Sequence, residues 1–329
     1  MVKRVVFVML IGVLSIHVMA PRAKASSNNA ARKGAAIVLA SFGTTVPGAV
    51  GSIINIKKRV EQAFPDVLVK ITFTSNIIRS VWQKRQADAQ QWLDQGIPEE
   101  VLYVKNIVAT IGDLMESGYK DIIVQPTHMF YMEQSYDLEQ YINALSSIRT
   151  MKAKWQPFGR LVMGRPALGR PGVEHDYHRD LEHTVTILES DVRLARKEGA
   201  MLVYMGHGNE HWSTGIYAEF AHQMQQMYPD VVTCVGVVEG FPGIDQVSAC
   251  LYAFKKGKVV LKPFMIVAGD HAMNDMAGDE ADSWKSILTQ AGFEVKPVLE
   301  GLGANDAFAD IFVSHIKDAA QDAGISFKP

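Results

Sequence analysis

The chain has 329 residues, a formal net charge of -2 and a hydrophobic fraction of 48%, which together indicate a globular protein long enough for two domains. Its charges nearly balance, and its longest basic run is Lys57-Lys58-Arg59. A nucleic-acid-binding protein normally carries a basic patch or stripe. We therefore exclude nucleic acid as a partner.

The first residues have the order of a secretory signal peptide. Lys3 and Arg4 precede an apolar run over residues 5–20, and the small-residue pattern Ala23-Lys24-Ala25 follows. The run is shorter than the roughly 20 residues that a membrane-spanning helix needs. We expect residues 1–25 to be removed and Ser26 to begin a periplasmic protein with no membrane span. An uncleaved N-terminal anchor is the alternative.

After a polar linker over residues 26–34, apolar runs of strand length alternate with amphipathic segments of helix length. This alternation is typical of a parallel sheet covered by helices, so the predicted fold class is α/β. In the first half the pattern predicts strands over residues 35–40, 67–73 and 121–125, and helices over 50–63, 77–93, 107–116 and 133–146.

Glycines, prolines and arginines cluster over residues 159–172, where we place the divide between two halves. The second half predicts strands over residues 201–205, 231–237 and 258–261, and helices over 177–196, 216–227, 244–254, 283–291 and 307–320. In each half, a first strand runs into a glycine turn and a later strand ends in proline before a histidine-bearing loop. We therefore expect a duplicated α/β unit, with domains over residues 35–165 and 166–329. Facing domains of this kind bind ligands at the carboxyl ends of their strands.

Gly206-His207-Gly208 directly follows an apolar strand. Flanking glycines let the backbone approach a ligand closely and leave the imidazole exposed on a tight turn. His207 is therefore a candidate for metal binding. A histidine that only caps the following helix is the alternative.

A second histidine, His271, lies among the carboxylates of Asp270, Asp275, Asp279 and Glu280. Imidazole together with carboxylate suits a borderline divalent ion such as Co²⁺, Ni²⁺, Fe²⁺ or Zn²⁺. Asp270 or Asp275 could orient the imidazole ring. Helix capping is the alternative role for these acids.

Three further candidates lie at a predicted strand end or in the loop after one. Glu239 ends the apolar run over residues 231–238, on the same sheet edge as His207, and it is either a metal ligand or proton acceptor, or a turn residue. Glu133 either approaches the site from the other half or begins a helix. His128 is either a ligand or a polar group buried under its loop.

Two other patterns bear on chemistry. Cys234 and Cys250 are the two cysteines, and they either pair in an oxidising compartment or stay buried thiols. The sequence contains no GxGxxG after a strand, no GxxxxGK[ST] and no GxSxG elbow. We therefore expect no nucleotide cofactor.

A strand ending in SFGT, a strand ending in MGHG and the segment PFMIVAGDHAMNDMAGDEADSW resemble the class II tetrapyrrole chelatases, specifically the anaerobic sirohydrochlorin cobalt chelatases of the CbiK type. The likeness runs from Ala35 to the C-terminus. It implies two flavodoxin-like domains related by a pseudo-two-fold, and a cleft between them that holds sirohydrochlorin. It also implies ATP-independent metal insertion, with His207 and His271 on the metal and either Glu239 or Glu133 as the active-site glutamate.

This chemistry suits the residues. A histidine pair and a carboxylate can replace the water ligands of the ion and accept pyrrole protons as general bases. Imidazole binds metal only when neutral, so activity is expected to fall below about pH 6.5. Sirohydrochlorin carries many carboxylates, for which Arg79 is the candidate cation. Ser41 and Gly208 are further candidates for substrate contact.

The leading hypothesis is a periplasmic sirohydrochlorin cobaltochelatase, a lyase of cobalamin or porphyrin biosynthesis, with Co²⁺ or possibly Fe²⁺ as substrate. Its expected partners are sirohydrochlorin and the metal, with a homo-oligomer as an open alternative. The rival hypotheses are a periplasmic solute-binding protein and a carrier of metal or haem. In the carrier hypothesis, haem binds outside the cleft, through His128.

Overall fold

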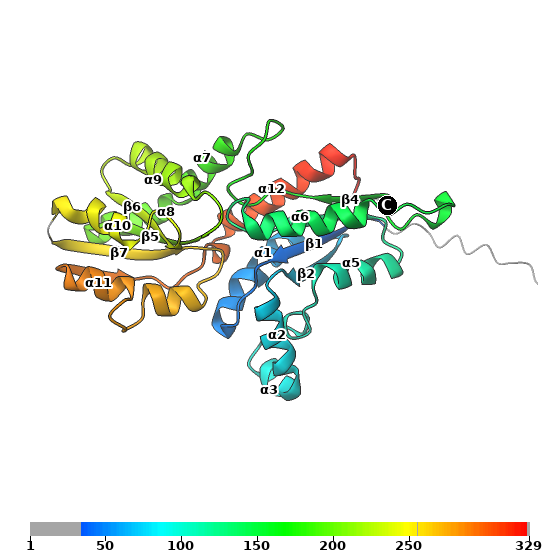
Figure 1. Cartoon of the computed structure of the whole chain (residues 1–329), viewed down its shortest axis with the longest axis horizontal. Coiled ribbons are helices and arrows are strands. Elements are labelled where there is room, and N and C mark those ends of the chain that lie inside the picture. Colours follow the sequence, from blue (N-terminus) through cyan, green and yellow to red (C-terminus); the bar gives the residue numbers. More distant parts are fainter. Residues whose placement is uncertain (1–33, 255, 328–329) are drawn as a thin grey trace, which may run out of the picture. The chain divides into compact units, whose positions relative to one another are not determined.

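The computed structural model describes residues 34–254 and 256–327, and within them the strands form two four-stranded sheets (Figure 1). The first sheet has the order β2-β1-β3-β4 and the second has the order β6-β5-β7-β8. All neighbouring strands are parallel. The repeated strand order confirms the predicted α/β fold. The predicted signal peptide, residues 1–25, lies outside the described residues, as does the linker up to residue 33.

The bounds of the elements follow the chain. The first-half strands are β1 (Ala36–Ser41), β2 (Leu68–Phe73), β3 (Asp121–Pro126) and β4 (Arg160–Met163), and the helices are α1 (Val50–Ala63), α2 (Asn76–Arg85), α3 (Ala89–Asp94), α4 (Glu99–Leu102), α5 (Ile107–Glu116) and α6 (Glu133–Ser146). The second-half strands are β5 (Ala200–Gly208), β6 (Thr233–Glu239), β7 (Gly257–Phe264) and β8 (Phe293–Pro297). Its helices are α7 (Tyr177–Ile187), α8 (Glu189–Glu198), α9 (Gly215–Met227), α10 (Ile244–Leu251), a π-helical turn (Ala272–Met276), α11 (Trp284–Gln290) and α12 (Asp306–Ala323).

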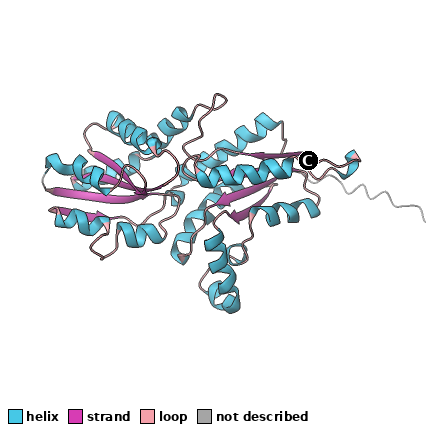
Figure 2. Cartoon of the chain, in the orientation of Figure 1, coloured by secondary structure: helices cyan, strands magenta, loops and turns pink. Residues whose placement is uncertain are grey.

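Both faces of each sheet are buried under helices, as Figure 2 shows. In the second sheet, Tyr204 of β5 packs in one cluster with Phe220 of α9, whereas Val203 packs in another with Val247 of α10. Successive side chains of a strand point to opposite faces, so a strand buried on both faces is apolar throughout. This explains why β1 and β5 read as continuous apolar runs.

The last helix, α12, packs against α1, β3 and β4 of the first half. Arg59 of α1 donates a hydrogen bond of 2.8 Å to Asp310 of α12, and Asn55 donates one of 3.0 Å to Asp306. Ile311 and Phe312 lie in the same buried cluster as Ile37 of β1. The C-terminal helix thus covers a face of the N-terminal sheet. The boundaries at residues 35–165 and 166–329 stay a prediction.

Several elements differ from the sequence-based expectations. Strands β4 and β8, of four and five residues, were not predicted because neither contains a long apolar run. Strand β4 lies in the segment that was interpreted as the divide, and β8 alternates charged with apolar residues. The predicted helix over 77–93 is interrupted at Gln86–Asp88, and the one over 177–196 is divided at Leu188. The turn after His271 is π-helical, a geometry that periodicity does not predict.

Cys234 and Cys250 form a disulfide that joins β6 to α10. Cys234 is buried in the sheet, whereas Cys250 lies on the exposed side of its helix. Of the two states left open by the sequence, the structure has the paired one. The bond fixes α10 to the strand that ends at Glu239.

Candidate functional site

His207 lies near the carboxyl end of β5, where two glycines allow close packing. A Cβ on Gly206 would lie 2.4 Å from the ring of Tyr217, and one on Gly208 would lie 1.8 Å from the carbonyl oxygen of Glu239. Gly208 also has a φ of +79°, which disfavours other residues. The imidazole between them is about one-third exposed, and its Nδ1 lies 3.1 Å from the carbonyl oxygen of Gly208. The glycines therefore place the ring at an open sheet edge.

His271 lies in the loop that follows β7, directly before the π-helical turn. Its Nδ1 is 2.7 Å from Oδ2 of Asp275, one turn further on. Burial of Ala272 and Met276 fixes the turn against the core of the second half. The ring is held, yet it stays more than one-third exposed.

The structure brings these two histidines together. The ring centroids of His207 and His271 are 4.8 Å apart, with the planes at 89°. Strands β5 and β7 are neighbours in register from Ala200↔Lys258 to Gly206↔Phe264, so the residues that follow them meet at one sheet edge. Within the parts of the chain that the structure describes, no three His, Cys, Asp or Glu side chains already form a metal-holding cluster.

The two candidate glutamates reach the site from different directions. Glu239 ends β6 opposite Gly208 of β5, and its Oε2 lies 3.7 Å from Nδ1 of His207. Glu133 begins α6 of the first half, and its Oε2 accepts a hydrogen bond of 3.0 Å from the side chain of Asn209. Glu239 thus lies beside His207 of the pair, whereas Glu133 contacts the loop that follows His207.

The three residues expected to contact substrate are occupied by contacts within the protein. Arg79 donates hydrogen bonds to the carbonyls of Phe73 and Thr74, and burial lowers the pKa of its guanidinium. The Ser41 hydroxyl is buried 2.6 Å from that of Thr127. The amide of Gly208 donates to the Tyr217 hydroxyl at 3.3 Å. Their predicted contacts with substrate stay predictions.

His128 is buried under the segment that leads into α6. Its Nδ1 lies 2.8 Å from the Ser135 hydroxyl, and burial lowers its pKa to about 4. Its Nε2 is also buried, without a hydrogen-bond partner among the described residues. A haem iron needs access to a ring nitrogen, and neither nitrogen of this ring is exposed at the surface. The structure therefore gives no support to haem binding through His128.

Sequence reasoning overlooked the aromatic residues near the site. The ring of Phe42, which follows β1 and is 39% exposed, lies 6.1 Å from that of His207. The ring of Trp212 lies 5.6 Å from Tyr136 and 6.3 Å from Tyr131, both in the first half. Phe42 belongs to the SFGT motif at the end of the first predicted strand, so the sequence could have indicated that it lies near the site. The pairing of Trp212 with the two tyrosines depends on tertiary structure and had no sequence signal.

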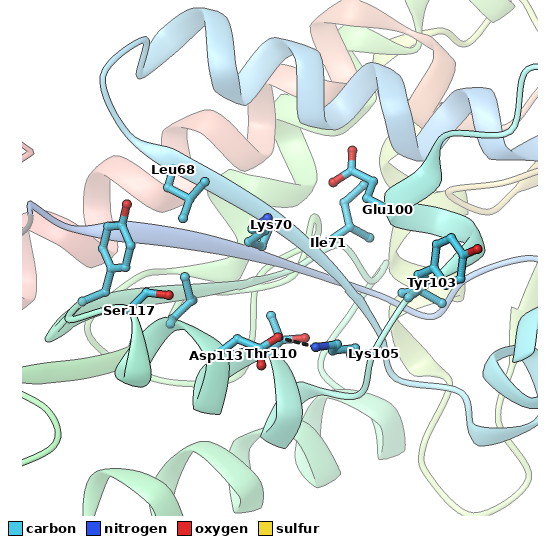
Figure 3. Close-up of a pocket in the computed structure, with 12 residues that line it drawn as sticks. Leu68, Lys70, Ile71, Glu100, Tyr103, Lys105, Thr110, Asp113 and Ser117 are labelled. Atoms are coloured by element: carbon cyan, nitrogen blue, oxygen red, sulfur yellow. Dashed lines mark hydrogen bonds and ion pairs between the residues drawn. The ribbon is translucent and has the colours of Figure 1, made fainter. Parts of the chain in front are cut away.

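A surface cavity of about 410 Å³ lies away from the histidines, beside β2 and α5 (Figure 3). Its lining includes Lys70, Tyr103 and an ion pair of 2.6 Å between Lys105 and Asp113. Another, of about 360 Å³, is lined in part by Arg165 and His315. Neither cavity includes His207 or His271. None of the described helices is both long and apolar enough to cross a membrane.

Comparison with known proteins shows that the sequence is similar to cobalt chelatases. A family model described as cobalt chelatase (CbiK) matches residues 35–321. The chain is 30% identical over 286 residues to a sirohydrochlorin cobaltochelatase of Salmonella typhimurium, a match that covers 86% of this chain and 96% of that protein. It is 27% identical over 283 residues to the sirohydrochlorin cobaltochelatase CbiKC of Nitratidesulfovibrio vulgaris, covering 86% and 89%. A solved structure of CbiX, the terminal enzyme for biosynthesis of siroheme in denitrifying bacteria, aligns with 87% of this chain and 99% of that chain, at 13% identity and a TM-score of 0.45.

Proposed function

Because the chain belongs to the cobalt chelatase (CbiK) family, we propose that it inserts Co²⁺, as a substrate, into the tetrapyrrole sirohydrochlorin without using a nucleotide. The observation that carries the proposal is the approach of the His207 and His271 rings to 4.8 Å. Imidazole is a preferred ligand of borderline divalent ions. Membership of the family therefore supports the proposed reaction, and the histidine pair supports the proposed location of the metal-binding site.

The reaction needs three things from the protein. Water must leave the ion, two pyrrole protons must leave the macrocycle, and the ion must be held at one face of the ring. Two neutral imidazoles can replace water ligands and release the ion again, and a nearby carboxylate can accept protons as a general base. His207, His271 and Glu239 have these roles in the proposal. Fe²⁺ is a second proposed substrate ion.

The macrocycle is proposed to lie between the first and second halves, at the edge where the histidines meet. Residues of both halves flank this edge: Phe42 lies beside His207, and Glu133 accepts a hydrogen bond from Asn209. Exposed aromatic rings such as Phe42 and Trp212 suit the flat apolar face of a tetrapyrrole. This arrangement would hold one face of the macrocycle against the metal-bearing histidines.

The protein is proposed to act in the periplasm after removal of residues 1–25. The Cys234–Cys250 disulfide supports this, because disulfides persist in oxidising compartments and are rare in the cytosol. Mass spectrometry of the secreted protein is expected to find Ser26 at its N-terminus. A mature protein that begins at Met1 would overturn the proposed export signal.

The function is tested by mixing the purified protein with sirohydrochlorin and Co²⁺ and following the absorbance spectrum of the macrocycle. We expect conversion to the cobalt form by the wild-type protein, with His207→Ala and His271→Ala slower by at least about 100-fold, the scale of losing a catalytic base or ligand. His222→Ala is the matched control, because this histidine is exposed on α9, where its Nε2 lies 2.9 Å from the side-chain nitrogen of Gln226, and it is not part of the proposed site.

Two results would contradict the proposal. If both active-site variants insert cobalt at the wild-type rate, the site is wrong. If the wild-type protein binds the tetrapyrrole or the ion but never joins them faster than the uncatalysed reaction, the chain is a carrier. Repeating the assay with Fe²⁺ measures the preference between the two ions.

A further inference from the structure

The proposed reaction does not yet explain the π-helical turn over Ala272–Met276, which lies within the acidic motif, residues 270–280. Single π-helical turns are rare and occur frequently at functional sites. Ala272 and Met276, at its two ends, are fully buried. The turn is therefore anchored to the core of the second half while His271 stays at the surface.

The surrounding residues hold the turn in this form. The Gly278 amide donates a hydrogen bond of 2.9 Å to the Asn274 carbonyl, and a Cβ on Gly278 would lie only 2.4 Å from that oxygen. The Ser283 hydroxyl donates to the Gly278 carbonyl at 2.7 Å. Asp270 accepts a hydrogen bond of 3.0 Å from the Asn274 side chain. The side chain of Asp270 thus stabilises the turn and does not orient the His271 ring.

Asp275 alone among the acids of this motif contacts His271, with 2.7 Å between Oδ2 and Nδ1. A carboxylate oxygen accepts hydrogen bonds, so this contact requires that Nδ1 carry the proton. In a neutral imidazole the other nitrogen, Nε2, then keeps its lone pair. The contact therefore selects the tautomer in which Nε2 can bind a metal ion.

His207 has a different partner. Its Nδ1 faces the Gly208 carbonyl at 3.1 Å, which can only accept a hydrogen bond and therefore also favours a proton on Nδ1. Glu239 lies 3.7 Å from the same nitrogen, which is too long for a direct hydrogen bond. The tautomer of His271 thus depends on a carboxylate side chain that a substitution can remove, whereas His207 faces a main-chain carbonyl.

We propose that Asp275 is a positioning residue for metal insertion, which fixes the Nδ1–H tautomer of His271 so that Nε2 is offered to the incoming Co²⁺. This inference rests on the proposed function and names the group that prepares the site for its metal substrate. Partners of this kind fix the tautomer and the orientation of a metal-binding histidine, and their loss typically weakens metal affinity by about 10–100-fold. Asp275 acts through His271 and does not touch the ion.

The test compares Asp275→Ala, Asp275→Asn and Asp275→Glu with the wild-type protein. Co²⁺ is titrated into each protein without tetrapyrrole, and KM for Co²⁺ and kcat are then measured with sirohydrochlorin. Asp275→Ala loses the acceptor, and Asp275→Asn can also donate, so neither enforces the tautomer. We expect both to weaken Co²⁺ binding and raise KM by about 10–100-fold, with kcat changed less. Asp275→Glu keeps an acceptor and is expected to recover part of the affinity.

Asp279→Asn is the matched control, because it removes the same charge from the same loop. Asp279 is exposed and pairs with Lys285 at 2.6 Å, so we expect Co²⁺ affinity within about twofold of wild type, as for a surface ion pair. Unfolding curves of all variants check that the fold is kept. ¹⁵N spectra of labelled histidine provide a direct check, in which His271 of the wild-type protein should be protonated at Nδ1.

The inference is overturned if Asp275→Ala binds Co²⁺ as tightly as the wild-type protein, or if the spectra show the proton of His271 on Nε2. Failure of the proposed function gives a different pattern. In that case the wild-type protein does not catalyse cobalt insertion, so no variant differs from it in that assay. The Co²⁺ titrations without tetrapyrrole still test whether Asp275 strengthens binding of the ion by the histidine pair.

Discussion

At the scale of single residues, the site is defined by which nitrogen or oxygen each side chain has available. The sequence predicted His207 from its strand and glycine turn, and it predicted His271 from its acidic context and the family likeness. It could not choose between Glu239 and Glu133, because strand ends from the two halves meet only in three dimensions. In the structure, Oε2 of Glu239 lies 3.7 Å from Nδ1 of His207, whereas Glu133 accepts a hydrogen bond from Asn209.

These positions predict different effects of removing each carboxylate. Glu239→Gln is expected to lower kcat for cobalt insertion by about 100-fold, within the range for general-base catalysis. Glu133→Gln keeps an oxygen that can accept from Asn209, so we expect a loss of less than about tenfold, comparable to one hydrogen bond. Steady-state assays of both variants measure this. The reverse order would assign the proton acceptor to Glu133.

His128 predicts a pH effect on stability rather than on catalysis. Burial lowers its pKa to about 4, whereas an unfolded histidine titrates near 6.5. Between these values the unfolded chain binds more protons, so the free energy of unfolding falls as pH drops below about 6.5 and levels off below about 4. From the two pKa values this amounts to about 2 kcal/mol at pH 5.

Urea unfolding of the wild-type protein and of His128→Asn at pH 7 and pH 5 isolates this contribution. The variant is expected to lose about 2 kcal/mol less on acidification. Asp180 does not interfere: burial alone would raise its pKa, but hydrogen bonds from His315 and Arg165 lower it to about 2, so its effect falls at more acidic pH. Equal losses in both proteins would show that His128 is protonated in the folded state.

At the scale of elements, apolar runs and amphipathic periodicity predicted most helices and the strands β1, β2, β3, β5, β6 and β7. Strands β4 and β8 escaped prediction because they are only four and five residues long, and the apolar residues of β8 alternate with charged ones. The π-helical turn escaped because it depends on the packing of Ala272 and Met276 and on the close approach of Gly278. The Cys234–Cys250 bond depends on how α10 lies on β6, so the sequence left its state open.

The disulfide is expected to stabilise the second half. The bridge closes a chain segment with a sequence separation of 16 residues, for which the loop-entropy model gives about 3 kcal/mol. Unfolding the wild-type protein with and without a reductant should show this loss. Cys250→Ser should resemble the reduced protein and be insensitive to reductant. Identical curves for oxidised and reduced wild type would mean that the bond does not constrain the unfolded chain.

At the scale of the whole molecule, the same strand order recurs in both sheets, yet the halves are not packed independently. Helix α12 comes from the end of the chain and covers the face of the first sheet that carries Ile37 and Leu39. The sequence predicted the duplication from the echo of two strand-and-turn motifs. It could not assign α12 to a sheet, because an amphipathic helix does not encode which apolar face it will cover.

This packing predicts how a fragment behaves. Residues 35–165 alone lack α12 and would expose the apolar face beneath it, so we expect the fragment to bind a hydrophobic dye and to unfold without a cooperative transition. Residues 35–329 are the control and should unfold cooperatively. A sharp thermal transition of the short fragment would show that the first half folds without α12.

The central claim is that His207 and His271 handle the metal substrate. The most direct test is X-ray absorption at the cobalt edge of the protein mixed with Co²⁺ in the absence of tetrapyrrole. The account predicts two imidazole ligands in the wild-type protein and one in either His207→Ala or His271→Ala, with nitrogen about 2.0–2.1 Å from the ion, by analogy with zinc. A spectrum with oxygen ligands alone, or one that neither substitution changes, would contradict it.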